Sequence, residues 1–361
     1  MAEMTMKERV HAMIRGLPHD RVPFLQLSNM AGPNEKIWSV IGRRNMGLLG
    51  YPWLYRFVTP NCSVEEQHFT RDGCKGVRTI LRTSKGDMMQ EKVIEPALRS
   101  SSFARHYVQD VDDYARLLAY FRDIRMELNY DQFRQFEREF GDDGCLLPGL
   151  AINTPYQGLW IHYVGLEKMC LDMADYPDLI EEVFQEFSRL LDITFDLLCK
   201  AAGEIDFDYV NFGDNITAPV IGEPYFRKYC LPYYNRLADK LKKAGRNVLV
   251  AVHTDGEIKP LWPAITESKV RVIDSFTPRP DTQTSVAEAL ALRPDLRLGI
   301  NFPSSVHLRD EATIYRTAME MLEQGGHSGR IMFQISENVP PGVWKKSFPQ
   351  IVKAIRDFGQ V

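Results

Sequence analysis

The sequence places a histidine and a carboxylate where one predicted strand ends. Five of the six residues from Val248 to His253 are apolar, which is typical of a strand buried on both faces of a parallel sheet. His253 and Asp255 are two residues apart, so their side chains should point to the same side of the strand. An imidazole beside a carboxylate can transfer protons or bind a metal ion. The alternative is a histidine that closes the strand and an Asp255 that caps the following helix.

Polar residues also end the other segments of strand length. The carboxyl ends of parallel strands meet at one face, and in α/β proteins this face carries the chemistry. We therefore expect an active-site mouth formed by the residues at these ends, which are Asn29, Asn153, Asp214, Asn215, His253, Asp255, Asp274, Asn301 and Glu337.

Strand-like and helical segments alternate regularly from residue 145 onwards. The predicted strands are 145–153, 208–214, 247–253, 270–276, 296–301 and 331–336, and a first strand is predicted at 21–29. The predicted helices are 165–174, 177–202, 223–244, 258–264, 285–292, 309–324 and 346–358. Repeated units of this kind need right-handed crossovers and a parallel sheet. The pattern favours an α/β fold of the (β/α)₈ TIM-barrel type.

The N-terminal part has a different periodicity. Residues 30–60 are expected to be irregular, whereas 65–71, 77–83 and 88–93 are short strand-like runs separated by Asp72-Gly73 and by Lys85-Gly86-Asp87, which are hairpin turn signals. We interpret residues 62–96 as an antiparallel β meander inserted into one barrel domain that covers residues 1–361.

Composition and missing motifs narrow the class of protein. The chain has 44% hydrophobic and 25% charged residues and a formal charge of −4, so neither nucleic acid nor a membrane surface is an expected partner. Its N-terminus is no signal peptide, and we expect a cytoplasmic protein with reduced cysteines. The sequence contains neither the glycine-rich nucleotide motifs nor a G-x-S-x-G elbow, which argues against nucleotide binding and acyl-serine chemistry.

Four stretches together resemble the uroporphyrinogen decarboxylase superfamily. They are FGDNITAPVIGEPYFRKYCLPYYNRLADKLKKAG, VLVAVHTDGEIKPL, LGINFPSSV and ISENVPPGVW, and the similarity covers roughly residues 145–358. The superfamily is built on a distorted (β/α)₈ barrel. It contains the decarboxylase and corrinoid-linked methyltransferases, which move methyl groups to or from cobalamin proteins.

Two departures from the decarboxylase pattern favour the methyltransferase branch. The region after the first predicted strand reads QLSNMAGPNEK and lacks the arginines that would hold a substrate with eight carboxylates. Glu337 also stands where the decarboxylase has a histidine. The resemblance therefore implies transfer of a methyl group from a small methylated substrate, such as a methoxylated aromatic, to the Co(I) corrinoid of a partner protein. The Asp-x-His-x-x-Gly signature of a corrinoid-binding module is absent from this sequence.

The resemblance also implies a site. Related coenzyme M methyltransferases bind zinc through a His-x-Cys pair and a later Cys, and these positions correspond here to His253, Asp255 and Glu337. These three residues are expected either to hold zinc or another divalent ion or to form a proton-donating network. Without a cation the two carboxylates would repel, and one would take up a proton. The residues expected to contact the substrate are Asp214, Asn215, Asn301, Asn29, Met30, Phe212 and Tyr163.

Two other functions stay open at this point. One is a metal-dependent decarboxylase or lyase that acts on a small acid. The other is a non-catalytic relative that binds a corrinoid protein or a small ligand, and its sign would be a mouth blocked by side chains. A homodimer is compatible with each of these functions.

Overall fold

The structure, a computed structural model, describes residues 3–95, 100–150, 152–337 and 339–361. Within these residues the chain divides into two units. The first unit comprises Met1–Leu54, Tyr130–Ala151 and Ala202–Val361, and the second comprises Tyr55–Asn129 and Ile152–Ala201.

A parallel sheet of eight strands forms the centre of the first unit. In spatial order its strands are β10 (Tyr209–Ile216), β11 (Leu249–Thr254), β12 (Val272–Phe276), β13 (Arg297–Asn301), β14 (Ile331–Ile335), β1 (Phe24–Leu27), β2 (Gly47–Gly50) and β9 (Gly144–Leu146). Just after β9, Gly149 forms a parallel bridge with Asn211 of β10. The Leu150 N–H donates to the Asn211 carbonyl at 2.9 Å, and the Asn211 N–H donates to the Pro148 carbonyl at 2.9 Å. The sheet is therefore curled until its first and last strands meet, which fits a TIM barrel.

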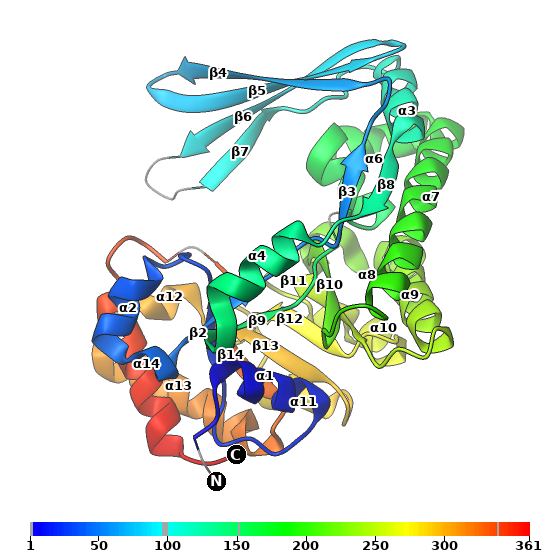
Figure 1. Cartoon of the computed structure of the whole chain (residues 1–361). Coiled ribbons are helices and arrows are strands. Elements are labelled where there is room, and N and C mark those ends of the chain that lie inside the picture. The colour runs from blue at the N-terminus through cyan, green and yellow to red at the C-terminus, as the bar shows by residue number, and fades with distance from the viewer. Residues whose placement is uncertain (1–2, 96–99, 151, 338) are drawn as a thin grey trace. The chain divides into compact units, whose positions relative to one another are not determined.

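Helices cover the outside of this sheet (Figure 1). They are α2 (Asn34–Ile41), α4 (Asp131–Phe140), α8 (Ala218–Tyr229), α9 (Leu231–Lys243), α10 (Trp262–Glu267), α11 (Val286–Ala291), α12 (Ser304–His307), α13 (Glu311–Gly325) and α14 (Trp344–Phe358), with short 3₁₀ turns at Arg43–Asn45, Gly141–Asp143, Lys259–Leu261 and Gly326–Ser328. In the described part of the chain, no helix is long and apolar enough to cross a membrane.

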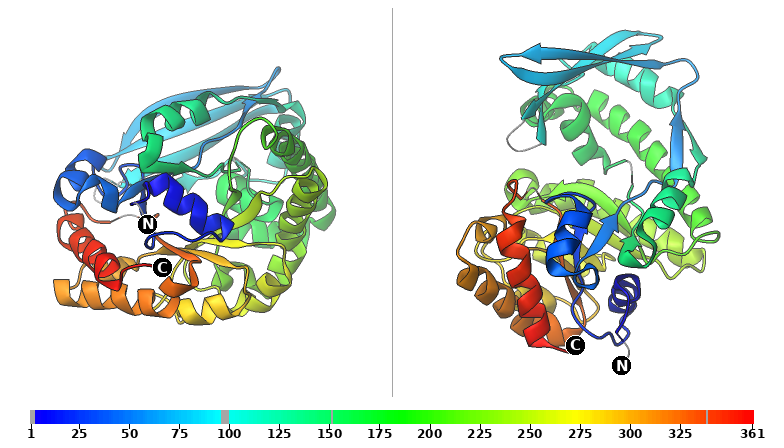
Figure 2. Two further views of the ribbon diagram at one scale, coloured as in Figure 1. Left: turned by 60° about the horizontal axis from the view of Figure 1, so that its bottom comes forward. Right: turned by 60° about the vertical axis from the view of Figure 1, so that its left-hand side comes forward.

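Helix α1 (Met6–Arg15) closes one end of the sheet, and Figure 2 (left) shows it in dark blue across the ring of strands and helices. Its N-terminus is fixed by a capping box between Thr5 and Glu8. The apolar side chains of this helix pack against one inward-facing residue from each of seven strands. Together with Leu147 they form a buried core, made of Met6, Val10, Met13 and Ile14 from the helix and of Leu25, Leu49, Cys145, Tyr209, Ala251, Val272 and Met332 from the strands. This end of the barrel is therefore filled, and a ligand has to enter from the other end.

The second unit combines antiparallel strands with helices. Its four-stranded sheet is a meander of β4 (Ser63–Arg71), β5 (Cys74–Thr83), β6 (Gly86–Glu95) and β7 (Ser100–Arg105), and β3 (Tyr55–Val58) pairs with β8 (Arg125–Leu128). Its helices are α3 (Asp113–Asp123), α5 (Pro155–Gly158), a π-helix (Leu159–Val164), α6 (Leu166–Asp175) and α7 (Pro177–Ala201). The long α7 buries one apolar stripe, which includes Phe187, and the Phe187 ring meets that of Phe121 edge-on at 5.1 Å.

Most predicted elements are present, with three differences. Residues 30–60 were expected to be irregular but contain α2, β2 and β3. Strand β2 was missed because Gly47–Gly50 is too short for its alternation to be recognised. Strand β9 covers Gly144 and only two of the nine predicted residues, Cys145 and Leu146, since Pro148 cannot donate a backbone hydrogen bond, and Ala151 lies outside the described residues. Antiparallel strands occupy the predicted meander, but β7 adds a fourth, and residue 96 is not described. That the meander is an insertion into a single barrel domain stays a prediction.

Gly299 of β13 tests the packing inside the barrel. A Cβ atom on this residue would lie 2.0 Å from Nε2 of Gln334, so Gly299→Ala should force the Gln334 side chain to move. Such overpacking costs about 1–3 kcal/mol, and the thermal unfolding midpoint should fall. Gly213→Ala is the matched control, because a Cβ there has no atom within 4 Å. Equal midpoints for the two variants would contradict the packing described.

Candidate active site

The carboxylate of Asp274 is the centre of a buried hydrogen-bond network inside the barrel. Its Oδ1 accepts hydrogen bonds from Tyr51 Oη at 2.8 Å, Gln334 Nε2 at 3.0 Å and Tyr209 Oη at 3.4 Å. Its Oδ2 accepts from Asn211 Nδ2 at 2.9 Å and pairs with His253 Nδ1 at 2.7 Å. The Asp274 side chain is completely buried, and such a carboxylate requires this number of donors.

Strand alternation explains why these residues meet. In four strands, and directly after β2, the network residue lies two positions beyond a residue of the barrel core: Tyr51 follows Leu49, Asn211 follows Tyr209, His253 follows Ala251, Asp274 follows Val272 and Gln334 follows Met332. Tyr209 is itself a core residue. Residues two apart in a strand share a face. The network is thus the layer of side chains directly above the apolar core.

A cavity of about 730 Å³ opens above this layer. Its apolar wall is formed by Leu27, Met30, Tyr51, Trp53 and Leu150. Its polar wall is formed by Asn211, Asn215, His253, Asp255, Ser304, Ser336 and Glu337, with Gly149 and Gly213 between them. All of these residues belong to the first unit. The structure therefore brings His253, Asp255, Glu337, Asn215 and Met30 to one cavity, and their roles in catalysis, metal binding or substrate binding stay predictions.

The protonation of His253 is set by opposing effects. Burial lowers the pKa of its imidazole, but the hydrogen bond to Asp274 and the negative charges of Asp274, Asp255 and Glu337 outweigh burial and raise it above the ordinary value. Because Nδ1 is engaged by Asp274, Nε2 is the ring nitrogen left for a ligand.

Glu337 and Asp255 form a pair of carboxyl groups. Burial raises the pKa of Glu337, and the charge of Asp255 and a hydrogen bond with it raise the pKa further. The Ser304 hydroxyl, which donates to Glu337 Oε2 at 2.9 Å, acts in the opposite direction, as does His253.

The expected zinc or other divalent ion has no geometric support. Within the ranges that the structure describes, no three His, Cys, Asp or Glu side chains are arranged to hold a metal ion. The bond of His253 Nδ1 to Asp274 leaves Nε2 open for a metal ion or for a proton. A metal bound by His253, Asp255 and Glu337 stays a prediction.

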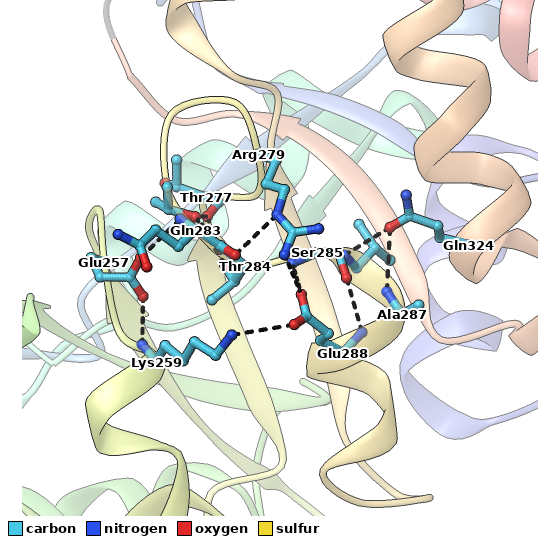
Figure 3. A network of polar contacts seen from close by, with 12 residues as sticks. Glu257, Lys259, Thr277, Arg279, Gln283, Thr284, Ser285, Ala287, Glu288 and Gln324 are labelled. Carbon is cyan, nitrogen blue, oxygen red and sulfur yellow. Dashed lines mark hydrogen bonds and ion pairs between the residues drawn. The ribbon is translucent and has the colours of Figure 1, made fainter.

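Hydrogen bonds and ion pairs connect the loops that follow β11 and β12, the strands that carry His253 and Asp274 (Figure 3). The Glu257 carboxylate accepts hydrogen bonds from the backbone N–H groups of Lys259 at 2.7 Å and Gln283 at 2.9 Å, which joins the loop after β11 to the loop after β12. Glu288 pairs with Lys259 and Arg279, each at 3.3 Å. Hydrogen bonds from Ser285 are the main reason that the pKa of Glu288 is lowered to about 2. The ends of β11 and β12 are thus held together from outside the cavity.

Several predicted substrate residues lie elsewhere. Asp214 and Phe212 have the opposite parity to Asn211 and face α9: Tyr234 Oη donates to Asp214 Oδ2 at 2.6 Å, and the rings of Phe212 and Tyr234 are 4.7 Å apart. Asn301 is buried beside Ser336, and Asn29 is exposed and bonds to Asn34. Tyr163 belongs to the second unit, where its ring meets Phe121 at 5.1 Å. In the described structure none of these five lines the cavity.

Other site residues were not singled out from the sequence. Asp274 was noted at a strand end, but Tyr51, Asn211 and Gln334 lie inside or beside strands without a motif. A second small network joins Ser275 Oγ to Ser336 Oγ at 2.7 Å, and Ser336 Oγ donates to Asn301 Oδ1 at 3.2 Å. Ser275 has φ +60° and lies where the register of β12 and β13 shifts, so it also reaches the barrel interior. Positive φ at a non-glycine residue is common at functional sites.

Replacing Asp274 tests the origin of the His253 pKa. In Asp274→Asn the burial of His253 is no longer opposed by the Asp274 hydrogen bond and charge, so its pKa should fall below that of the unchanged protein. Histidine NMR titration of chelator-treated protein measures this. His307, whose pKa burial lowers to about 4, serves as the internal control. An unchanged His253 titration would contradict the network.

The raised pKa of His253 also affects the stability of the fold. It contributes stability below about pH 6.5, and this contribution is lost as the pH rises through the folded-state pKa of His253.

Comparisons with known proteins place the chain in a family. A search of curated proteins finds no match. Among solved structures, a methyltransferase from Methanosarcina mazei is similar over 99% of both chains, with 14% identity and a TM-score of 0.59, and this likeness shows the fold. A B12-independent methionine synthase from Shewanella sp. W3-18-1 is similar over 78% of this chain and 73% of its own, with 14% identity, and its TM-score of 0.39 is too low to support a conclusion.

The family model described as uroporphyrinogen decarboxylase (URO-D) matches residues 159–358. This range contains five of the eight barrel strands and the residues His253, Asp255, Asp274 and Glu337. Because the match covers more than half of the 361 residues, the chain belongs to the uroporphyrinogen decarboxylase family.

Proposed function

We propose that the protein transfers a methyl group from a small methylated substrate to the Co(I) corrinoid of a separate partner protein. The observation that carries the proposal is the cavity above the Asp274 layer, which joins an oriented imidazole and a carboxyl pair to an apolar wall. Family membership and the shared fold with a methyltransferase support it. The corrinoid protein and the donor are substrates in this scheme.

The residues of the cavity can position a donor and stabilise its leaving group. Co(I) corrinoids are strong nucleophiles, so the protein does not have to supply one. Asp274 fixes the His253 ring through Nδ1, and the raised pKa favours an Nε2–H that can donate a proton to the atom that loses the methyl group. Met30, Tyr51 and Trp53 offer apolar contacts to a methyl group and to the body of the donor.

The donor can be neutral or positively charged. A methoxylated aromatic would suit the rings of Tyr51 and Trp53, and His253 would then protonate the departing oxygen. Asp255 and Glu337 line the same cavity and favour a positively charged donor.

The two other functions considered from the sequence are less well supported. A decarboxylase or lyase acting on a small acid would bring an anion next to Asp255 and Glu337, which would repel it. A non-catalytic relative was expected to have a blocked mouth, whereas the cavity has a volume of about 730 Å³.

Filling the cavity tests the proposal for any donor. The test begins with a screen of methyl ethers, methylamines and quaternary methylammonium ions against Co(I) cobalamin, in which methylation of cobalt is followed by absorbance. Gly213 lines the cavity, and a Cβ on it has free space, so Gly213→Phe should fold and occupy the donor site. Methyl transfer should fall by at least about a hundredfold. Gly213→Ala should keep near-normal transfer. Equal rates in Gly213→Phe and the unchanged protein would contradict the site, and a screen without any active donor would contradict the function.

Uroporphyrinogen should not be a substrate. No arginine or lysine occurs among the described residues that line the cavity, while two carboxyl groups do. Holding a substrate with eight carboxylates there would require cationic partners. Fluorescence detection of coproporphyrinogen, after oxidation to the porphyrin, should show no rate above that of heat-inactivated protein. A rate above this background would contradict the methyltransferase assignment.

A further inference from the structure

The charged side chains around the cavity are mainly acidic. Asp255 and Glu337 line it, and the buried Asp274 lies directly beneath His253. Among the described lining residues there is no lysine or arginine, and a proton on His253 is balanced by Asp274. The cavity therefore favours a ligand with positive charge.

Asn211, which lines the cavity, has a buried hydrogen-bond acceptor without a partner among the described residues. Asn211 is 4% exposed and lines the cavity, and its Nδ2 donates to Asp274 at 2.9 Å. This bond fixes which end of the amide is the oxygen, and Oδ1 has no hydrogen-bond partner among the described residues. A buried acceptor of this kind calls for a donor or a positive charge on the ligand.

The opposite wall suits methyl groups on a cation. Tyr51 and Trp53 line the cavity, and the bond from Tyr51 Oη to Asp274 at 2.8 Å holds the Tyr51 ring in the wall. Aromatic rings attract quaternary ammonium groups within about 6 Å. Leu27 and Met30 add apolar surface beside them.

We propose that the cavity binds a small methylated ammonium ion, and that this ion is the methyl donor. Its role as donor rests on the proposed function, whereas its binding does not. A divalent metal ion is the other cation to consider. The described residues include no set of three His, Cys, Asp or Glu side chains that would hold one, and the aromatic wall has no ligand atoms that suit a metal ion.

An ammonium donor also simplifies the chemistry. The carbon–nitrogen bond breaks and its electron pair stays on nitrogen, so a neutral tertiary amine leaves. The methyl group is taken up by the electron pair of the Co(I) acceptor on the partner protein. A neutral amine needs no proton in order to leave, whereas an alkoxide does.

Binding is tested with two ligands that differ in charge alone. Choline and 3,3-dimethylbutan-1-ol have the same shape, because a carbon replaces the nitrogen in the latter. Isothermal titration calorimetry of the full chain, without corrinoid, should show choline binding at least about tenfold more tightly. Equal affinities, or tighter binding of the neutral alcohol, would overturn the proposal.

Charge-removing variants locate the binding site. Glu337→Gln and Asp255→Asn should each weaken choline binding severalfold and leave the binding of the neutral alcohol unchanged. Glu257→Gln is the matched control, because Glu257 lies in the same loop as Asp255 but bonds to the loop after β12 and does not line the cavity. All three variants are checked for unchanged thermal midpoints. Equal loss of choline binding in Glu257→Gln and Glu337→Gln would show general surface attraction and would refute the site.

Comparing ligand binding with methyl transfer separates this inference from the proposed function. Choline binding without methyl transfer to Co(I) from any ammonium donor would overturn the donor role and leave the binding site standing. Methyl transfer from ethers in a protein that does not bind choline would overturn the ammonium inference and support the proposed function. Stoichiometric binding of Zn²⁺ or Mg²⁺ that is lost in Glu337→Gln and that excludes choline would assign the acidic pair to a metal.

Discussion

The arrangement of the site depends on one buried negative charge. Taking the Asp274 carboxylate out of water is unfavourable unless donors surround it, and these donors come from β10, β11, β14 and the residue after β2. The same bonds that stabilise Asp274 orient the Tyr51 ring, the Asn211 amide and the His253 imidazole. Removing this charge would therefore disturb the Tyr51 ring, the Asn211 amide and the His253 imidazole together.

The sequence predicted the parts of the fold that have a strong period. The long apolar stripe of α7 and the six C-terminal strand segments were found because each repeats one pattern over enough residues. Strand β2 was missed because GLLG is short, and its glycines make room for neighbours instead of packing themselves: a Cβ on Gly47 would lie 2.2 Å from Met6 Cγ. Such a strand exists because of tertiary packing, which a local pattern does not reveal.

The candidate site was predicted in part, for a similar reason. His253 and Asp255 share a face by spacing alone, and the resemblance added Glu337, which the structure brings to the same cavity. Asp214 and Phe212 were misassigned because a strand has two faces, and the sequence does not say which one is inward. Tyr51, Asn211 and Gln334 meet Asp274 through the register of strands far apart in the chain, which no short motif encodes.

The way in which the chain passes between its two units has a consequence for folding. Residues 130–151, which contain β9, belong to the first unit but lie in the chain between the two segments of the second unit. These segments are Tyr55–Asn129 before them and Ile152–Ala201 after them. The Gly149–Asn211 bridge that joins β9 to β10 therefore closes a long loop, whose entropic cost is smaller if the second unit has already folded. We expect the meander and α7 to gain protection in pulse-labelled hydrogen exchange before β9 does, and simultaneous protection would argue against this order. Closure of the barrel would then depend on the prior folding of a unit whose described residues contribute no strand to it.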